Sequence, residues 1–269
     1  GVQTCALPIC ITKASWMSEH ELKRLNNIRA IDWIIEYLDQ RFWYSPDQKP
    51  KIFPKRIGDR VGIFRSGTGT GKSTVFPPAI FNKFFDANKK TVICTQPTVV
   101  TTVEIPQQIV LFNKNLKLGK NIGYQTKALV LRPVRGILFS TIGILLQHLK
   151  TLTDEEFGKK YSFIILDEIH NRSIETDTTL YYLKQYLKRN FQSPECPYII
   201  LTSGTFDPKP LMDYFDCSAN SFLDIIGSSF PIQDNFLDYS LTDLLTFIAD
   251  LIEKIHVENL QDDELRHIM

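Results

Sequence analysis

The sequence predicts an α/β domain in which a parallel central sheet is covered by helices on both faces. Short apolar runs alternate with helical stretches, and the runs are continuous rather than alternating, as in strands buried on both faces. The predicted strands are Val61–Arg65, Thr91–Thr95, Gly136–Ser140, Ser162–Leu166 and Tyr198–Thr202. The predicted helices are Lys72–Phe85, Thr101–Phe112, Ile142–Leu149, Thr178–Leu187 and Pro208–Tyr214. In such sheets, ligands bind beyond the carboxyl ends of the strands, so the residues that follow each strand are candidates for function.

The composition is that of an ordinary globular protein and excludes disordered and fibrous classes. The chain has 269 residues, of which 43% are hydrophobic and 23% charged, and 31 basic against 30 acidic residues give a net charge of +1. Any contact with nucleic acid must therefore be local. Apolar stretches stay shorter than the roughly 18 residues of a membrane span, so no membrane crossing is expected. The five cysteines form no C-x-x-C pair, which argues against a zinc site and favours a reducing, intracellular compartment, cytoplasmic or nuclear.

The chain before residue 60 is predicted to be an extension of the main domain. Residues 1–9 lack the basic start and apolar length of a signal peptide. They are interpreted as the translation of a sequencing-library adapter, because Ala6-Leu7-Pro8-Ile9 matches the translated end of such an adapter. Ser18 and Glu21 form a capping box, and isoleucines at helical spacing predict an amphipathic helix from Glu19 to about Phe42. Three prolines then break regular structure, so residues 10–59 are predicted to be a helix and linker.

A phosphate-binding loop follows the first predicted strand and precedes a helix, which is the context that such a loop requires. Its glycines allow backbone N–H groups to turn toward phosphate oxygens, Lys72 can reach the β and γ phosphates, and Ser73 can bind Mg²⁺. The sequence therefore predicts a nucleotide site. Its residues are Gly67, Thr68, Gly69, Thr70, Gly71, Lys72, Ser73 and Thr74.

Adjacent carboxylates follow the fourth predicted strand. Asp167, together with Ser73, is expected to hold Mg²⁺, and Glu168 is expected to lie at the metal site and to polarise the attacking water. An acidic pair at a strand end is by itself more often a helix cap, and the preceding phosphate-binding loop is what favours the catalytic interpretation. The hydroxyls of Ser203 and Thr205 follow the fifth strand at the same predicted edge.

In this order, these motifs resemble motifs I, II and III of superfamily 2 helicases, closest to the DEAH-box class. The resemblance spans about Arg60–Ile232. It is carried by Gly67–Thr74, Asp167-Glu168-Ile169-His170 with Asn171-Arg172-Ser173, Ser203-Gly204-Thr205, Thr95-Gln96-Pro97, Gly123-Tyr124, Ser140-Thr141-Ile142-Gly143 and Gly227–Ile232. Thr98-Val99 stands where many such proteins have paired arginines, and Gly204 stands in place of alanine.

The resemblance implies a RecA-like P-loop NTPase domain that uses ATP and Mg²⁺ to drive 3′ to 5′ translocation on, or unwinding of, a nucleic acid, with RNA expected rather than DNA. It implies that Lys72 and Glu168 act in hydrolysis, and that His170, Ser203 and Thr205 couple the nucleotide state to a nucleic-acid cleft. The residues implied to contact nucleic acid are Gln96, Pro97, Thr98, Thr141 and Gly143.

The resemblance also gives expected domain boundaries. Residues 60–232 are expected to form the first RecA-like domain, and residues 233–269 the start of a second, truncated one. The chain has no Gln-x-x-Gly-Arg-x-Gly-Arg sequence, so the arginine finger of the second domain is missing, and the fragment is expected to be monomeric and poorly active alone. An abundance of isoleucine, lysine and asparagine hints at an AT-rich genome such as that of a large DNA virus or a protist.

Two other functions remain open on the sequence. One is a P-loop ATPase that uses ATP as a conformational switch without strand separation. The other is an inactive nucleotide-binding domain that serves as an interaction module. A continuation of the reading frame without the glycine-arginine motif would favour the first, and a natural end at Met269 would favour the second.

Overall fold

The computed structural model describes residues 31–32, 34–42, 49–66, 72–204, 206–225, 246–250 and 252–253. The chain divides into two compact units, residues 1–229 and 230–269, and in the second unit residues 246–250 and 252–253 are helical. Of the predicted N-terminal helix, residues 31–32 and 34–39 are helical and a turn follows at 40–41; the part before residue 31 lies outside the described residues. No helix among the described residues is both long and apolar enough to cross a bilayer.

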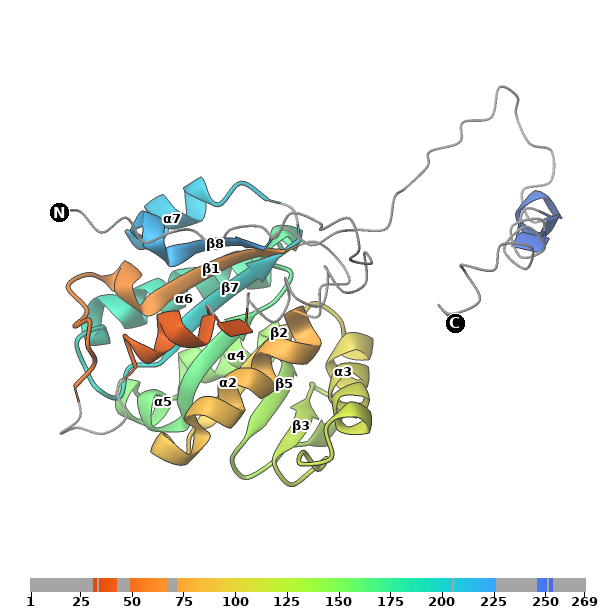
Figure 1. Ribbon diagram of the computed structural model, residues 1–269, viewed down its shortest axis with the longest axis horizontal. Coiled ribbons are helices and arrows are strands. Elements are labelled where there is room, and N and C mark those ends of the chain that lie inside the picture. Colours follow the sequence, from red (N-terminus) through yellow and green to blue (C-terminus); the bar gives the residue numbers. More distant parts are fainter. Residues whose placement is uncertain are drawn as a thin grey trace, which may run out of the picture. The chain divides into compact units, whose positions relative to one another are not determined.

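The first unit contains one eight-stranded sheet with the order β4-β3-β5-β2-β6-β7-β1-β8 (Figure 1). All neighbouring strands are parallel except β3 and β4, which are antiparallel. The strands are β1 Val61–Ser66, β2 Thr91–Gln96, β3 Ile122–Gln125, β4 Val130–Leu131, β5 Ile137–Thr141, β6 Tyr161–Leu166, β7 Tyr198–Ser203 and β8 Phe222–Ile225.

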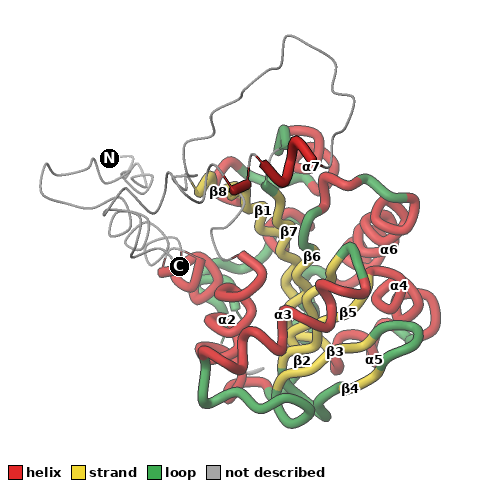
Figure 2. The backbone as a smooth tube through the Cα atoms, turned by 90° about the vertical axis from the view of Figure 1, so that its right-hand side faces the viewer, coloured by secondary structure: helices red, strands yellow, loops and turns green. Residues whose placement is uncertain are grey.

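Helices cover both faces of this sheet, and alternate side chains of each strand supply two separate cores (Figures 1 and 2). In β6, for example, Phe163 faces one core and Ile164 the other. The helices on the Phe163 side are α2 Lys72–Asn88 and α3 Val99–Phe112. Those on the Ile164 side are α4 Ile142–Thr151, α5 Asp154–Lys160, α6 Ile174–Asn190 and α7 Lys209–Phe215.

The predicted fold class is confirmed, and each predicted strand lies within one residue of an observed one. The structure adds β3, β4, β8 and α5, which the sequence patterns did not indicate. It also begins two helices earlier than predicted. Thr98 caps α3 by accepting a hydrogen bond from the N–H of Thr101 (3.2 Å), and Ser173 caps α6 by accepting one from the N–H of Thr176 (3.1 Å).

A buried arginine fixes the start of β1. Arg60 ends the short 3₁₀ helix η1 Ile57–Arg60 and is 0% exposed. Its guanidinium donates hydrogen bonds to the carbonyls of Phe191 (2.8 Å), Ser193 (2.7 Å) and Cys196 (3.0 Å) and lies 4.7 Å from the centre of the Tyr198 ring. The loop between α6 and β7 is thereby tied to the strand that leads into the candidate site.

Candidate functional site

Lys72 lies at the carboxyl-terminal edge of the sheet, between the ends of β1 and β6. It begins α2, its side chain is buried, and its Nζ donates a hydrogen bond to the carbonyl of Ser66 (2.8 Å). The same Nζ lies 3.9 Å from Oε1 of Glu168, the second residue after β6. A cation held at the first residue of a helix is suitably placed to meet an anionic ligand at that helix terminus.

Asp167 is the centre of the site, because donors from several elements converge on its buried carboxylate. Its Oδ2 accepts hydrogen bonds from Ser73 Oγ in α2 and from Gln96 Nε2 at the end of β2 (3.1 Å). Its Oδ1 accepts from Thr202 Oγ1 in β7 (2.6 Å) and from the N–H of Glu168 (3.0 Å). An ionised carboxylate is an acceptor only, so these donors fix its orientation.

The contact between Ser73 and Asp167 fits a magnesium site. A carboxylate and a hydroxyl oxygen, brought into hydrogen-bond contact from two different elements, belong to the all-oxygen ligand set that Mg²⁺ takes in proteins. Glu168 was expected in the same set. Its carboxylate oxygens contact Lys72 Nζ (3.9 Å) and His170 Nδ1 (3.1 Å), and its place among the metal ligands stays a prediction.

A left-handed backbone conformation turns the chain directly after Asp167. Glu168 has φ 53° and ψ 42°, a conformation that costs a non-glycine residue about 1 kcal/mol or more. The short helix that follows, η2 Ile169–Asn171, carries His170 back toward the sheet, where its Nδ1 lies 2.9 Å from Ser203 Oγ at the end of β7. Glu168, His170 and Ser203 therefore form a connected polar chain across two neighbouring strands.

Of the residues expected to contact nucleic acid, Gln96 is buried and its amide is committed to Asp167. Pro97 and Thr98 are exposed just beyond it, and the Thr98 hydroxyl caps α3. Thr141 pairs in register with Gln96 and precedes α4, with no hydrogen bond from its side chain to the helix.

Gly143 lies in the first turn of α4, facing α6. A Cβ atom at this position would lie 3.6 Å from the carboxylate oxygens of Glu175. A phosphate that approached this turn would therefore meet a negative charge as well as backbone N–H groups.

Part of the predicted site lies outside the described residues: Gly67 to Gly71 of the phosphate-binding loop, Thr205, and the predicted strand Gly227–Ile232. Thr74 follows Ser73 in the first turn of α2 and is half-buried.

Thr202 is a site residue that was not predicted from the sequence. This residue ends the apolar run of β7, and β7 is hydrogen-bonded to β6, so its hydroxyl reaches Asp167 from the neighbouring strand. The sequence does show a hydroxyl at the end of a predicted buried strand. Linking that hydroxyl to Asp167 requires the strand order, which the sequence patterns did not indicate.

Cys94 lies beneath the carboxylate as a neutral, unreactive group. Burial raises the pKa of its thiol well above the usual value, the charge of Asp167 raises it further, and the hydrogen bond from Gln96 lowers it. Since the thiolate is the nucleophilic form, this cysteine is not a candidate nucleophile.

Comparison with known proteins agrees with this geometry. Residues 46–214 match the model of the DEAD/DEAH box helicase family. A protein of African swine fever virus, named as a putative RNA helicase, is 34% identical over 247 residues, which are 86% of this chain and 25% of that protein. A DExH-box ATP-dependent RNA helicase of Arabidopsis thaliana is 33% identical over 168 residues, 62% of this chain and 16% of that protein.

A third relative, from Mycosarcoma maydis, is named as a putative DEAH-box ATP-dependent helicase and is 27% identical over 192 residues, 67% of this chain and 12% of that protein. The chain thus spans a quarter or less of the length of these relatives. The family match covers most of the described sheet, and the mostly parallel, helix-covered sheet is consistent with a RecA-like helicase domain. The chain belongs to the DEAD/DEAH box helicase family.

Proposed function

We propose that this chain carries the first RecA-like domain of an ATP-dependent RNA helicase, which binds and hydrolyses ATP to move along RNA from 3′ to 5′. The observation that carries the proposal is the convergence on Asp167 of Ser73, Gln96 and Thr202, from α2, β2 and β7. Support for RNA comes from the names of the relatives, two of which include the words RNA helicase.

The residues at this edge would each have a separate role in ATP hydrolysis. Lys72 leaves the Ser66 carbonyl and neutralises the β and γ phosphates, and the loop Gly67–Thr74 wraps them with N–H groups. Mg²⁺ held by Ser73 and Asp167 supplies further positive charge at the phosphates. Glu168 accepts a proton from the attacking water through its carboxylate.

His170 and Ser203 would connect hydrolysis to RNA. Their hydrogen bond joins the residues after β6 to the end of β7, so a change in the contacts of Glu168 would alter the position of Ser203. Thr205, which follows in sequence, would take part in the same coupling. Pro97, Thr98, Thr141 and Gly143 would contact the RNA backbone, while Gln96 acts through Asp167 rather than on RNA directly.

The whole protein would be divided into domains at the boundaries expected from the sequence. Residues 10–59 would be an N-terminal helix and linker, 60–232 the first RecA-like domain, and 233–269 the start of a second that supplies an arginine finger. The protein would act as a monomer. The viral relatives support an origin in a large DNA virus.

The test is a Glu168→Gln substitution, made both in this chain and in the complete protein from which it comes. The substitution keeps the shape of the side chain and removes the base. We expect the affinity for a fluorescent ATP analogue to stay within about threefold, and RNA-stimulated ATP hydrolysis by the complete protein to fall about 100-fold or more.

Glu36→Gln is the matched control, because Glu36 is exposed in the helix of residues 34–39, away from both the nucleotide edge and the α5 lysines. It should hydrolyse ATP at the parent rate. A Glu168→Gln protein that also hydrolyses ATP at that rate would contradict the role of Glu168. Parent hydrolysis that is indifferent to RNA would reject the helicase proposal in favour of an ATP-driven switch.

A further inference from the structure

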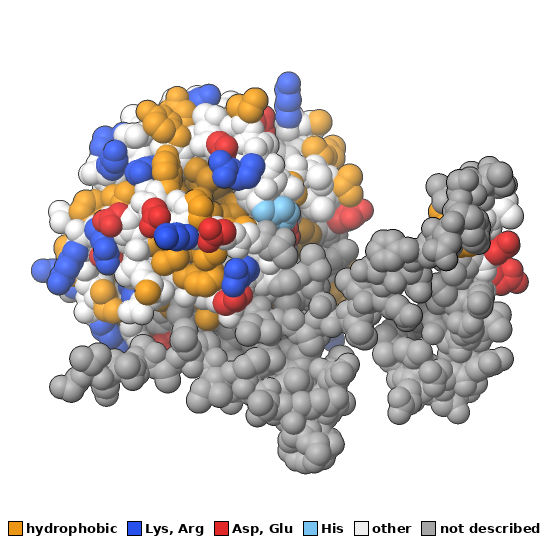
Figure 3. All heavy atoms as spheres, turned by 90° about the horizontal axis from the view of Figure 1, so that it is seen from above, with side chains coloured by type: hydrophobic (Ala, Val, Ile, Leu, Met, Phe, Trp, Pro, Cys, Tyr) orange, Lys and Arg blue, Asp and Glu red, His pale blue; other side chains and the backbone are white. Residues whose placement is uncertain are grey.

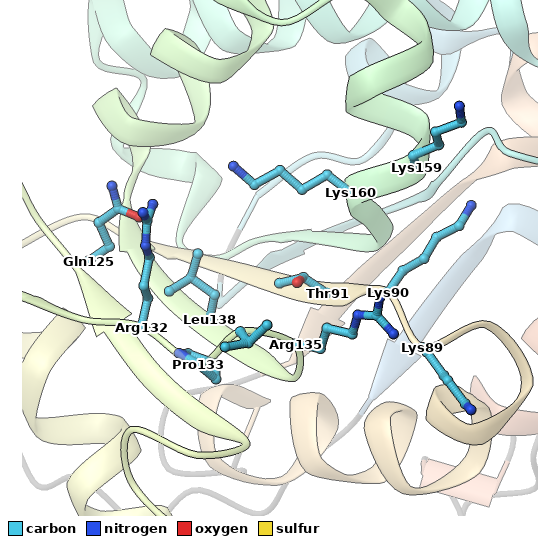
Figure 4. Close-up of a pocket in the computed structure, with 11 residues that line it drawn as sticks. Lys89, Lys90, Thr91, Gln125, Arg132, Pro133, Arg135, Leu138, Lys159 and Lys160 are labelled. Atoms are coloured by element: carbon cyan, nitrogen blue, oxygen red, sulfur yellow. The ribbon is translucent and has the colours of Figure 1, made fainter.

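A second polar site lies at the opposite edge of the same sheet, where the strands begin. It is a pocket of about 490 Å³, and Figure 4 shows the side chains that line it. Six of them are basic and come from the residues just before three adjacent strands, β5, β2 and β6. They are Arg132 and Arg135 before β5, Lys89 and Lys90 before β2, and Lys159 and Lys160 at the end of α5, before β6.

The positive charge of this pocket is only partly neutralised. None of the described residues that line it is acidic. Lys90 pairs with Glu195, and Lys159 pairs with Glu155. Among the described residues, no carboxylate lies within ion-pair distance of the other four, which are Lys89, Arg132, Arg135 and Lys160. On the face drawn in Figure 3, by contrast, basic and acidic side chains are interspersed.

Two of these cations face the cavity from different elements. In Figure 4, Lys160 extends from α5 toward the side of the pocket where Arg132 and Gln125 lie, and Leu138 and Thr91 lie below it in this view. Burial lowers the pKa of Lys160, and the charge of Arg132 lowers it further. A titratable neighbour of Lys160 is His148, whose Nε2 is 3.5 Å from Lys160 Nζ and offers no negative charge. Like charges held together without a counter-ion favour binding of an anion.

The pocket also holds an unsatisfied polar group. Gln125, at the end of β3, has a side-chain oxygen that is buried without a hydrogen-bond partner among the described residues. Buried polar atoms in native proteins almost always have a partner. Because an amide can turn over, this group can donate to an anion or accept from a hydroxyl.

We propose that this pocket binds the phosphodiester backbone of a single-stranded nucleic acid, at a site separate from the nucleotide edge. The basic residues precede three adjacent strands spaced about 4.8 Å apart, so they form a row about 10 Å long, along which successive phosphates fit. No aromatic side chain is among the described residues that line the pocket, so these residues offer bases no stacking surface, and we expect the contact to be independent of sequence. An acidic peptide is the competing ligand, and the experiment includes it.

The experiment measures the salt dependence of binding to a fluorescein-labelled oligouridylate by fluorescence anisotropy. It compares this chain with the double variant Arg132→Gln/Lys160→Gln. Each phosphate contact contributes about 0.7 to the slope of log affinity against log salt concentration for single strands. Loss of two contacts should therefore lower the slope by about 1.4 and weaken binding at low salt by tenfold or more.

The matched control is Lys114→Gln/Lys188→Gln, which removes the same charge from exposed lysines that do not line the pocket. It should keep the parent slope. Equal slopes for the two double variants would overturn the proposal. It would also be overturned if polyglutamate displaced the RNA as effectively as unlabelled oligouridylate does, because the pocket would then be a site for acidic peptides.

Lysine acetylation read by mass spectrometry provides a second measurement, which needs no substitution. Bound oligouridylate should protect Lys89 and Lys160 from acetylation and leave Lys188 as reactive as before. Equal reactivity of all three lysines with and without RNA would reject the site. Because neither readout depends on ATP, failure of this proposal is distinguishable from failure of the proposed helicase function.

Discussion

The carboxylate of Asp167 accepts four hydrogen bonds, which is about the full capacity of its two oxygens. A divalent cation must therefore displace a donor in order to bind there. Ser73 is the donor suited to this exchange, because a hydroxyl that turns its hydrogen away becomes a ligand itself, whereas the amide nitrogen of Gln96 cannot. The remaining donors, from Gln96, Thr202 and the N–H of Glu168, then keep the carboxylate in place.

A single residue, His148, should make the free energy of unfolding depend on pH. Its Nδ1 lies 2.7 Å from the hydroxyl of Tyr161, and burial, with the charges of Lys160 and Arg132, lowers its pKa to about 4. In the unfolded chain the pKa returns to about 6.5, so the unfolded chain binds the proton first as pH falls. Stability should therefore decrease from about pH 6.5 down to about pH 4.

Urea unfolding of the parent and of His148→Gln, at intervals between pH 7.5 and 4, measures this effect. Carboxylates contribute acid sensitivity to both proteins, so the difference between their midpoints isolates the imidazole. We expect the variant to lose less stability than the parent as pH falls through this window. Parallel pH profiles for the two proteins would show that His148 is not the group responsible.

At the scale of elements, the central strands were predictable because burial on both faces leaves a continuous apolar run. The missed strands lack this signal. β3 contains a glycine, and β4 consists of two exposed residues at the sheet edge. α5 is short and charged, although Thr153 and Glu156 form a capping box that could have identified it.

The two sites differ in how much of each could be predicted from the sequence. Residues directly after predicted strands, such as Asp167 and Ser203, were found because parallel strands share a carboxyl edge. The basic residues of the pocket come before their strands, and only the strand order brings them together. Basic pairs such as Lys89-Lys90 and Lys159-Lys160 were the visible signal.

Gly136, next to the start of β5, is a position where adding a side chain should destabilise the fold. It joins the loop after β4 to β5, has a φ of 143°, and a Cβ atom there would lie 2.1 Å from the carbonyl oxygen of Asn121. That carbonyl accepts the hydrogen bond from the N–H of Ile137. We expect Gly136→Ala to lower the free energy of unfolding by about 2–4 kcal/mol, measured by urea unfolding.

Gly143→Ala is the control for this substitution, because its Cβ would meet only ordinary contacts at 3.6 Å and more. In a helix, alanine is favoured over glycine by up to about 1 kcal/mol, so this variant should be as stable as the parent or slightly more so. If Gly136→Ala unfolds at the same urea concentration as Gly143→Ala, the backbone at residue 136 is not constrained as described.

At the scale of the first unit, the candidate nucleotide site and the basic pocket occupy opposite ends of the same strands. β2 and β6 each have six residues, a length of about 20 Å. Side chains at one edge therefore do not touch ligands at the other. Single substitutions at the two edges should act independently.

Lys72→Ala tests this independence. Loss of a charged contact of about 1.5–3 kcal/mol should weaken binding of a fluorescent ATP analogue about tenfold to 100-fold. The slope of RNA affinity against salt should stay unchanged. Arg132→Gln/Lys160→Gln should show the reverse pattern, with parent nucleotide affinity and a reduced slope. A loss of both activities in either variant would show that the edges are coupled or that the fold is disturbed.

The strand order also has a consequence for synthesis of the chain on the ribosome. β1 pairs with β7 and β8, whereas β2, β3, β5 and β6 pair among themselves. About 130 residues separate the end of β1 from the start of β7. At a synthesis rate of roughly 5–20 residues per second, β7 is completed on the order of ten seconds after β1, and until then β1 has no strand to pair with. The strand that leads into the phosphate-binding loop is thus synthesised first among the strands and pairs late. A nascent chain that stalls before Tyr198 leaves the apolar side chains of Val61, Ile63 and Phe64 without their partner strand, where chaperones can bind them or aggregation can begin.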